Sequence, residues 1–433
     1  MTYAESLPEN IRKRGRIYAY GSTLFGCISE VLLDNSAVII IYFTMLDGGD
    51  MLTMMGTSFT GIAGALLYLP SSMIIVRTGL KPMVLYSCLA GSSGFLLMAL
   101  SPLIGMTAAK YAALGGCLIY CISRVTYGAT WFPLLDAFLR PEDRAGFFSK
   151  MRLIYSSFNG VMLFCIGLLM LHNPSIVILQ VVIAIAGIAY MGRYLCIARF
   201  PENKRDVVDI PDIKKGFGIA LRNGPLTSYA VYNGLFTIAY STLTPLSYLY
   251  MNQYVKLNPG TVQIISSAGI GGLIAGYFCY GRLFANTKLK YMELAAHLIF
   301  MMTAFTLFLV DGSTCGFAWI AGTVVFFQSV GYSIYMCNNS AELLALARPG
   351  NKTMAMAFVL TYSSAGSAIS RFGTSLILGT AMLSPVWSCG MRQISSYQTL
   401  FLLFGIMLLV LLFLLPTLPS FVPNHDDYYE PKK

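Results

Sequence analysis

Long apolar runs dominate this chain and restrict what it can fold into. A helix needs about 20 consecutive apolar residues to cross the hydrocarbon core of a bilayer. Hydrophobic residues make up 56% of the 433 positions and charged residues only 11%, whereas soluble domains carry about 25% charged residues. The pattern predicts an all-α polytopic membrane protein with twelve transmembrane helices, because barrel strands would be alternating segments of about 10 residues. The predicted spans are 17–45, 52–76, 82–104, 111–138, 147–171, 176–199, 226–250, 261–284, 292–311, 316–345, 354–381 and 397–415.

Motifs of metal and nucleotide chemistry are absent from the sequence. Its three histidines, His172, His297 and His425, form no H-E-x-x-H pair and no His/Cys cluster with metal-ligand spacing. It also lacks the G-x-x-x-x-G-K-[ST] loop, so nucleotide-driven pumping would need a separate subunit. We therefore expect a protein that is not an enzyme and that has no cofactor and no metal.

Lysine and arginine residues predict the orientation of the chain, since they accumulate in cytoplasmic segments. With the N-terminus inside, 24 of the 29 lie in inner segments, Arg193 being counted there, and three lie outside. The remaining two, Arg124 and Arg371, lie deep inside predicted spans. The pattern predicts a multi-pass protein of the plasma (inner) membrane with both termini in the cytoplasm. The net charge of +10 is then a topology signal, and nucleic acid is not needed to explain it.

A polar stretch divides the predicted spans into two groups of six. The predicted domains are a basic cytoplasmic segment (1–16), an N-terminal bundle (17–200), a cytoplasmic linker (201–225), a C-terminal bundle (226–415) and a cytoplasmic tail (416–433). The groups also resemble each other. Asp136 near the end of the fourth span is followed by R-P-x-x-R, ending at Arg144, and Glu342 in the tenth is followed by R-P-x-x-K. Similar segments six helices apart, in the same orientation, indicate a parallel pseudo-repeat, as found in one large class of transporters.

With this architecture, two short motifs resemble the major facilitator superfamily. The segment RTGLKP at 77–82 is similar to that family's loop signature D-R-x-G-R-[RK]-P, with Val76 and Leu80 departing from it. The segment RVTYG at 124–128 is similar to the fourth-helix signature R-x-x-x-G. The resemblance implies alternating access around one central site. It also implies an inner gate, for which we expect Arg77, Gly79, Lys81, Asp136 and Arg144.

Two acids in the first span are the strongest functional candidates. A charge at the bilayer centre costs about 2.5–3.5 kcal/mol on insertion scales, so such residues suggest function. Glu30 and Asp34 are four residues apart and share one face of a helix. Two like charges so close cannot both ionise easily, so we expect one of them to exchange a proton, with Arg124 as a partner. The alternative is that both acids only pair with Arg124 or Arg371 and hold helices together.

Arg371 in the eleventh span is the expected anchor for the substrate. Its guanidinium matches a carboxylate or phosphate, and in the resembled family the fourth-helix arginine is associated with proton coupling or helix contacts. Polar groups elsewhere in the spans could bind a ligand in an apolar pocket, or could simply hydrogen-bond between helices. The further candidates for the substrate site are Asn35, Tyr232, Asn233, Tyr240, Asn338 and Asn339.

These features together predict a secondary active transporter of a small polar or charged organic solute, working as a proton-coupled symporter. Carboxylates and amide oxygens also suit sodium, so a sodium-coupled version stays open. A proton-coupled exporter of amphipathic or cationic compounds is one alternative, and a membrane sensor that keeps a transporter fold is another. The expected partners are a small-molecule substrate and the lipid bilayer, and we expect a monomer.

Overall fold

The structure is a computed structural model, and it describes residues 7–34, 36–136, 138–139, 144–172, 174–201, 213–282, 289–346, 352–380, 382–389 and 392–418. Almost all of these residues are helical. The longer helices are α2 (Glu9–Asp34), α3 (Val38–Met45), α4 (Gly49–Thr78), α5 (Leu80–Leu100), α6 (Met106–Asp136), α7 (Arg144–His172), α8 (Ile176–Ala198), α9 (Ile213–Leu221), α10 (Gly224–Tyr240), α11 (Leu243–Leu249), α12 (Pro259–Arg282), α13 (Leu289–Leu309), α14 (Phe317–Leu346), α15 (Lys352–Gly379) and α16 (Ser396–Leu414). A two-stranded antiparallel ribbon, β1 (Val386–Cys389) with β2 (Arg392–Ser395), precedes α16.

Each of the twelve predicted ranges contains helix among the described residues, but not all of these helices qualify as spans. In the described residues, nine helices are long and apolar enough to cross a membrane, and α2 with α3 would make a tenth. The α10 helix has only 17 residues, and α15 carries a polar face that lines a cavity described below. The chain is therefore an integral multi-pass membrane protein, and the count of twelve stays a prediction.

Two of the predicted spans are broken near their middle. In the first, α2 and α3 are bent by 58° relative to each other. In the seventh, α10 ends at Tyr240 and α11 begins at Leu243. Pro245 explains this second break, because it has no N–H to donate to the carbonyl of Ser241, four residues earlier. Polar backbone at membrane depth is tolerated only where protein or a water-filled cavity satisfies it.

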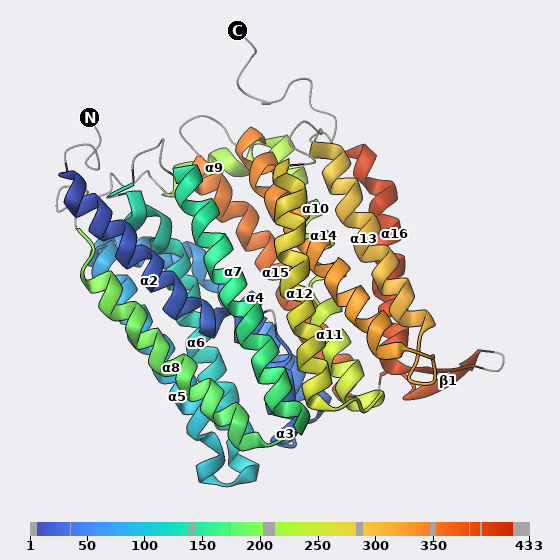
Figure 1. The fold of residues 1–433 in the computed structure, drawn as a ribbon. Coiled ribbons are helices and arrows are strands. Elements are labelled where there is room, and N and C mark those ends of the chain that lie inside the picture. The colour runs from blue at the N-terminus through green and yellow to red at the C-terminus, as the bar shows by residue number, and fades with distance from the viewer. Residues whose placement is uncertain are drawn as a thin grey trace.

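The two halves of the chain stand side by side, blue to green and then yellow to red in Figure 1. Across the boundary, α4 packs along α15 and α7 packs along α12. Glycines permit this close approach. A Cβ on Gly61 of α4 would lie 2.6 Å from the backbone nitrogen of Ala368, and one on Gly167 of α7 would lie 2.6 Å from a side-chain carbon of Ile264. Small residues at such positions let helix backbones meet in membranes.

Hydrogen bonds also join the halves along the first part of α4. They run from Arg371 to the Thr57 carbonyl (2.9 Å), from Ser375 to the Met51 carbonyl (2.7 Å) and from the Tyr397 hydroxyl to the Asp50 carboxylate. The positive-charge pattern places this end of α4 on the outer side of the membrane. The contacts therefore hold the halves together at the predicted outer end.

The predicted linker and inner gate are only partly described. The linker range 201–225 contains the helix α9, so part of it is structured. Gly79 connects α4 to α5 with a positive φ of 87°, a conformation that favours glycine. Lys81 donates to the carbonyl of Phe200 at 3.0 Å, which ties this connection to the end of α8. The side chains of Arg77, Asp136 and Arg144 lie outside the described part of the structure, so the inner gate stays a prediction.

Candidate functional site

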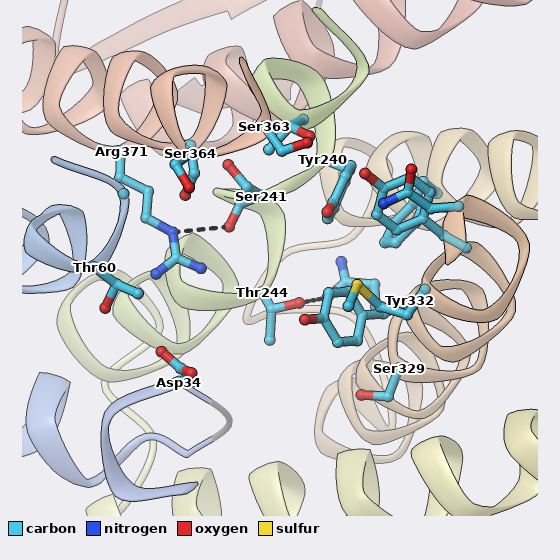
Figure 2. A pocket seen from close by; sticks show the side chains of 18 of the residues that line it. Asp34, Thr60, Tyr240, Ser241, Thr244, Ser329, Tyr332, Ser363, Ser364 and Arg371 are labelled. Carbon is cyan, nitrogen blue, oxygen red and sulfur yellow. Dashed lines mark hydrogen bonds between the residues drawn. The ribbon is translucent and has the colours of Figure 1, made fainter. Parts of the chain in front are cut away.

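A cavity of about 230 Å³ lies between the two halves (Figure 2). The N-terminal half lines it from α2, α4 and α6, and the C-terminal half lines it from α10 through α15. Most of the lining residues carry a polar group, among them Asp34, Thr60, Tyr68, Arg124, Thr237, Tyr240, Thr244, Gln328, Ser329, Tyr332, Tyr335, Asn339, Ser363, Ser364, Ser367 and Arg371. A polar cavity shared by both halves is the best candidate for a binding site in the described part of the chain.

Arg371, the expected substrate anchor, lines one wall of this cavity (Figure 2). Its Nε donates to the Ser241 carbonyl at 3.2 Å, the group that Pro245 leaves unpaired, and its Nη1 donates to the Thr57 carbonyl. Neither contact neutralises its charge, and no carboxylate lies within ion-pair distance of it among the described side chains. The remaining N–H donors of the guanidinium are thus available to a ligand.

Asp34 and Arg124 form an ion pair at the side of the cavity contributed by the N-terminal half. The Asp34 carboxylate and the Arg124 guanidinium belong to side chains that keep 20% and 27% of their surface exposed, so both can also meet a ligand or water. The pair joins α2 to α6 directly beside the break between α2 and α3.

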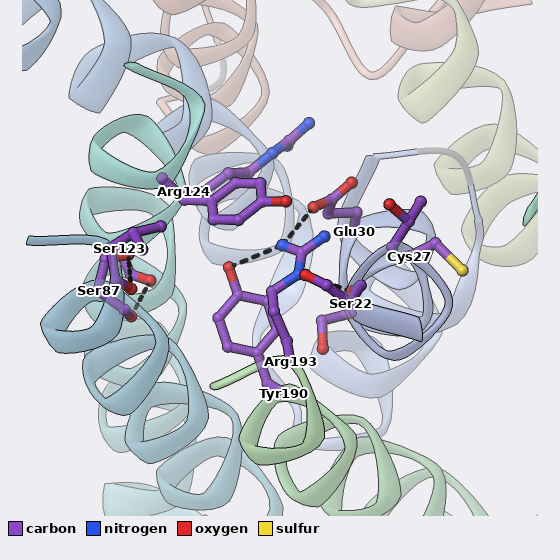
Figure 3. A network of polar contacts seen from close by, with 12 residues as sticks. Ser22, Cys27, Glu30, Ser87, Ser123, Arg124, Tyr190 and Arg193 are labelled. Atoms are coloured by element: carbon purple, nitrogen blue, oxygen red, sulfur yellow. Dashed lines mark hydrogen bonds and ion pairs between the residues drawn. The ribbon is translucent and has the colours of Figure 1, made fainter. Parts of the chain in front are cut away.

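Glu30 belongs to a different environment from Asp34. It pairs with Arg193 of α8 at 2.7 Å (Figure 3) and lines a second cavity, of about 210 Å³, within the N-terminal half. Arg193 also donates to the Ser22 carbonyl and the Tyr190 hydroxyl, and its guanidinium lies 3.9 Å from the centre of the Tyr127 ring. The expectation that two acids would confront each other is therefore not met, since each has its own arginine.

Arg193 is a partner of a candidate acid, Glu30, that the sequence analysis missed. The charge count placed it with the cationic inner segments, yet its side chain is only 2% exposed and its helix α8 packs against α2. A charge this deep implies a partner. The available signal for a deep position was that Arg193 lies more than one helical turn before Arg199, the next cation in the sequence. Sequence alone could not show that the partner would be Glu30.

The remaining substrate candidates separate into two groups. Tyr240 and Asn339 line the cavity together with Arg371. Tyr232, Asn233 and Asn338 do not, and instead hydrogen-bond to other helices of the C-terminal half. Their partners are His297 for Tyr232 (2.7 Å), Asn339 and Ser363 for Asn233 (3.3 and 2.8 Å) and Glu293 for Asn338 (2.8 Å). Asn35 lies outside the described residues.

A row of small hydroxyl residues on α15 was also missed. Ser363, Ser367 and Arg371 recur at four-residue intervals, so they share one face of the helix. All three line the cavity, as does Ser364. Polar residues at four-residue intervals that lead to an arginine were a readable signal that this helix lines a cavity. They also explain why α15 is not apolar enough to count among the nine candidate spans of the described residues.

No family model matches this chain, and no curated protein matches it in sequence. Its fold, in contrast, has many counterparts among solved structures. A mutant form of the nucleoside transporter NupG superposes with a TM-score of 0.70 at 12% identity, covering 93% of this chain and 98% of that one. A POT family transporter in complex with a thioalcohol-conjugated peptide gives 0.72 at 11% identity, with 96% and 100% covered. A bacterial homologue of the iron transporter ferroportin, in an inward-facing state, gives 0.64 at 11%, with 93% and 97% covered. At such identities the likeness establishes a shared fold.

Proposed function

We propose that this protein is a secondary active transporter that moves a small polar or charged organic solute by alternating access, as a proton-coupled symporter. The observation that carries the proposal is the guanidinium of Arg371, which faces a cavity between the halves with N–H donors to spare. The volume of about 230 Å³ is slightly below the roughly 300 Å³ at which drug-sized pockets begin. A small solute with an anionic group fits these dimensions and this charge.

The arrangement of the helices supports the alternating-access part of the proposal. We infer a parallel repeat from two observations. The first and seventh predicted spans, which are six apart, are both broken. The second span (α4) packs on the eleventh (α15), and six spans on, the eighth (α12) packs on the fifth (α7). Repeats of this type belong to transporters of the major facilitator superfamily. Contacts near the start of α4 close the predicted outer end, so the cavity would exchange with the inner side.

Proton coupling is assigned to the Asp34–Arg124 pair. The pair lies at the cavity and keeps some exposure, so a bound anion could compete with Asp34 for Arg124 and release the carboxylate to take a proton. Solute and proton would then bias the same conformational equilibrium. Glu30 and Arg193 would respond through the same helix, α2. Cation export is less well supported, because both acids already have arginine partners.

The remaining assignments belong to the same proposal. They are a location in the plasma (inner) membrane with cytoplasmic termini, a monomeric state, an inner gate that includes Gly79 and Lys81, and no cofactor beyond the coupling ion. A sensor that keeps this fold would need no polar cavity with a free guanidinium. Failure of the purified protein to transport any member of a broad solute panel would favour that alternative.

The test begins with a thermal-shift screen of the purified protein against organic acids, amino acids, peptides, nucleosides, sugars and cationic drugs. Hits are then measured with Arg371→Gln, with Arg282→Gln as a matched control, because Arg282 is exposed at the end of α12. Hydrogen bonds to charged groups are worth about 1.5–3 kcal/mol, so Arg371→Gln should weaken binding of an anionic hit by about tenfold or more. Equal affinity in wild type and Arg371→Gln would contradict the anchor role.

A further inference from the structure

The C-terminal half contains a buried carboxyl group for which the described side chains supply no counter-ion. Glu293, in the second turn of α13, is 5% exposed. Its carboxylate accepts a hydrogen bond from the amide of Asn338 on α14 at 2.8 Å, and no cation lies within 4 Å of it among the described side chains. The carbonyl oxygen of the Asn338 amide is itself buried and has no partner in the described residues. The pair therefore forms a polar site that the described residues alone do not satisfy.

The neighbouring histidine does not supply the missing charge. His297 follows Glu293 by one helical turn, and its Nδ1 lies 3.2 Å from the Glu293 backbone carbonyl. Its Nε2 lies 2.7 Å from the Tyr232 hydroxyl, and its ring stacks on Phe236. A neutral imidazole satisfies both contacts, with Nδ1–H donating to the carbonyl and Nε2 accepting from the tyrosine. The histidine is thus fully engaged away from the Glu293 carboxylate.

The other groups around Glu293 add no positive charge either. On its own helix, Lys290 forms no ion pair with it in the described structure. From α14 comes a second buried acid, Glu342, which is 8% exposed and follows Asn338 by one helical turn. The described tyrosines nearby are Tyr229 and Tyr232 of α10, Tyr280 of α12 and Tyr335 of α14. The α16 helix, which also packs on α13, carries no charged residue.

We propose that Glu293 is a second proton-binding site of the transporter, held by Asn338 and opposed by Glu342. An ionised carboxylate removed from water needs a counter-ion, and without one the neutral form is favoured. A second acid close by acts in the same direction. In this conformation Glu293 carries the proton, whereas Glu30 and Asp34 each contact an arginine.

Coupling to transport follows from the position of Glu293. Near the first residues of α13, it lies towards the end of the bundle that the charge pattern places inside. A movement of α13 against α14 that admits water would stabilise the charged form and release the proton on that side. This inference rests on the proposed transport function, but the occupancy of the site can be measured without any solute.

The test is an infrared pH titration of the full-length protein in nanodiscs, which follows the carbonyl stretching band of protonated carboxylic acids. Wild type should show a band that disappears as the pH rises. Glu293→Gln should reduce it, Glu293→Asp should restore a band with a changed midpoint, and Glu342→Gln should shift the remaining midpoint towards acid. The control Glu9→Gln removes an exposed acid that pairs with Arg16 at 2.6 Å, and should leave the band unchanged.

Thermal unfolding of each variant establishes that it is folded before its spectrum is compared. A band with the same intensity and midpoint in Glu293→Gln as in wild type would overturn the proposal, and so would its loss in Asp34→Asn alone. The failure of the broader function looks different. If the band depends on Glu293 but no solute is accumulated under a pH gradient, the proton-binding site is supported and proton-coupled transport is contradicted.

Discussion

The ion pair between Glu30 and Arg193 allows a quantitative prediction, because its two members differ in burial. The Arg193 side chain is 2% exposed, whereas that of Glu30 is 33% exposed and lines a cavity. Removing one partner of a buried pair costs about 3–5 kcal/mol, because the other charge stays behind without compensation. The size of that cost therefore depends on which charge remains.

Glu30→Gln leaves a buried guanidinium that keeps its contacts with Ser22 and Tyr190, so we expect a loss of about 3 kcal/mol of unfolding free energy. Arg193→Met removes the buried charge and leaves a carboxylate that can reach water. We expect about 1–2 kcal/mol for it, closer to the value of a partly exposed pair. In the Arg193→Met background, Glu30→Gln should cost little, which gives a coupling energy of about 3 kcal/mol.

The assay is a double-mutant cycle of equilibrium unfolding by denaturing detergent in mixed micelles, with tryptophan fluorescence as the signal. Reversibility of unfolding is established for each of the four proteins first. Two results would refute the reasoning. One is a larger loss for Arg193→Met than for Glu30→Gln, and the other is strict additivity of the two substitutions, which would mean that the pair carries no interaction energy.

Three further predictions concern the transport cycle and the packing of the helices. Asp34→Asn should abolish pH-driven accumulation of the solute in liposomes but spare exchange of the solute down its gradient. Full accumulation by this variant would contradict the assignment of proton coupling to Asp34. Gly26→Ala should destabilise the fold as strongly as Glu30→Gln, because a Cβ there would overlap the guanidinium of Arg193; unchanged detergent resistance would show that the arginine can move aside. Gly61→Leu should prevent close contact of α4 with α15 and open the predicted outer end, which would lengthen the distances between spin labels on these two helices. The control Gly128→Leu should leave these distances unchanged, because a Cβ at Gly128 meets nothing within 4 Å.

Much of the fold was predictable because hydropathy is a local property. Every predicted range contains helix among the described residues, and Glu30, Asp34 and Arg371 each line a cavity between helices. The breaks within the first and seventh ranges were not predicted, since an apolar run stays apolar across a bend. Pro245 was the visible cause of the second break, but its consequence, a carbonyl that Arg371 then binds, depends on a helix far along the chain.

The candidate site was predictable only in part, for a related reason. The sequence could mark Tyr232, Asn233, Asn338 and Asn339 as polar residues within spans. It could not tell which of them face a cavity and which satisfy each other, because that depends on how α10, α13 and α14 are rotated about their axes. The structure places Asn339 at the cavity and uses Asn338 to hold Glu293.

By itself, the sequence determined that this chain spans a membrane repeatedly and that few charges lie at depth, since the bilayer acts on each segment separately and excludes charge from each. Only the tertiary structure decided which charges meet. Glu30 and Asp34 share one helix face, yet they pair with Arg193 of α8 and Arg124 of α6. An ion pair forms between groups a few ångströms apart, and long-range packing alone brings those helices within that distance of each other.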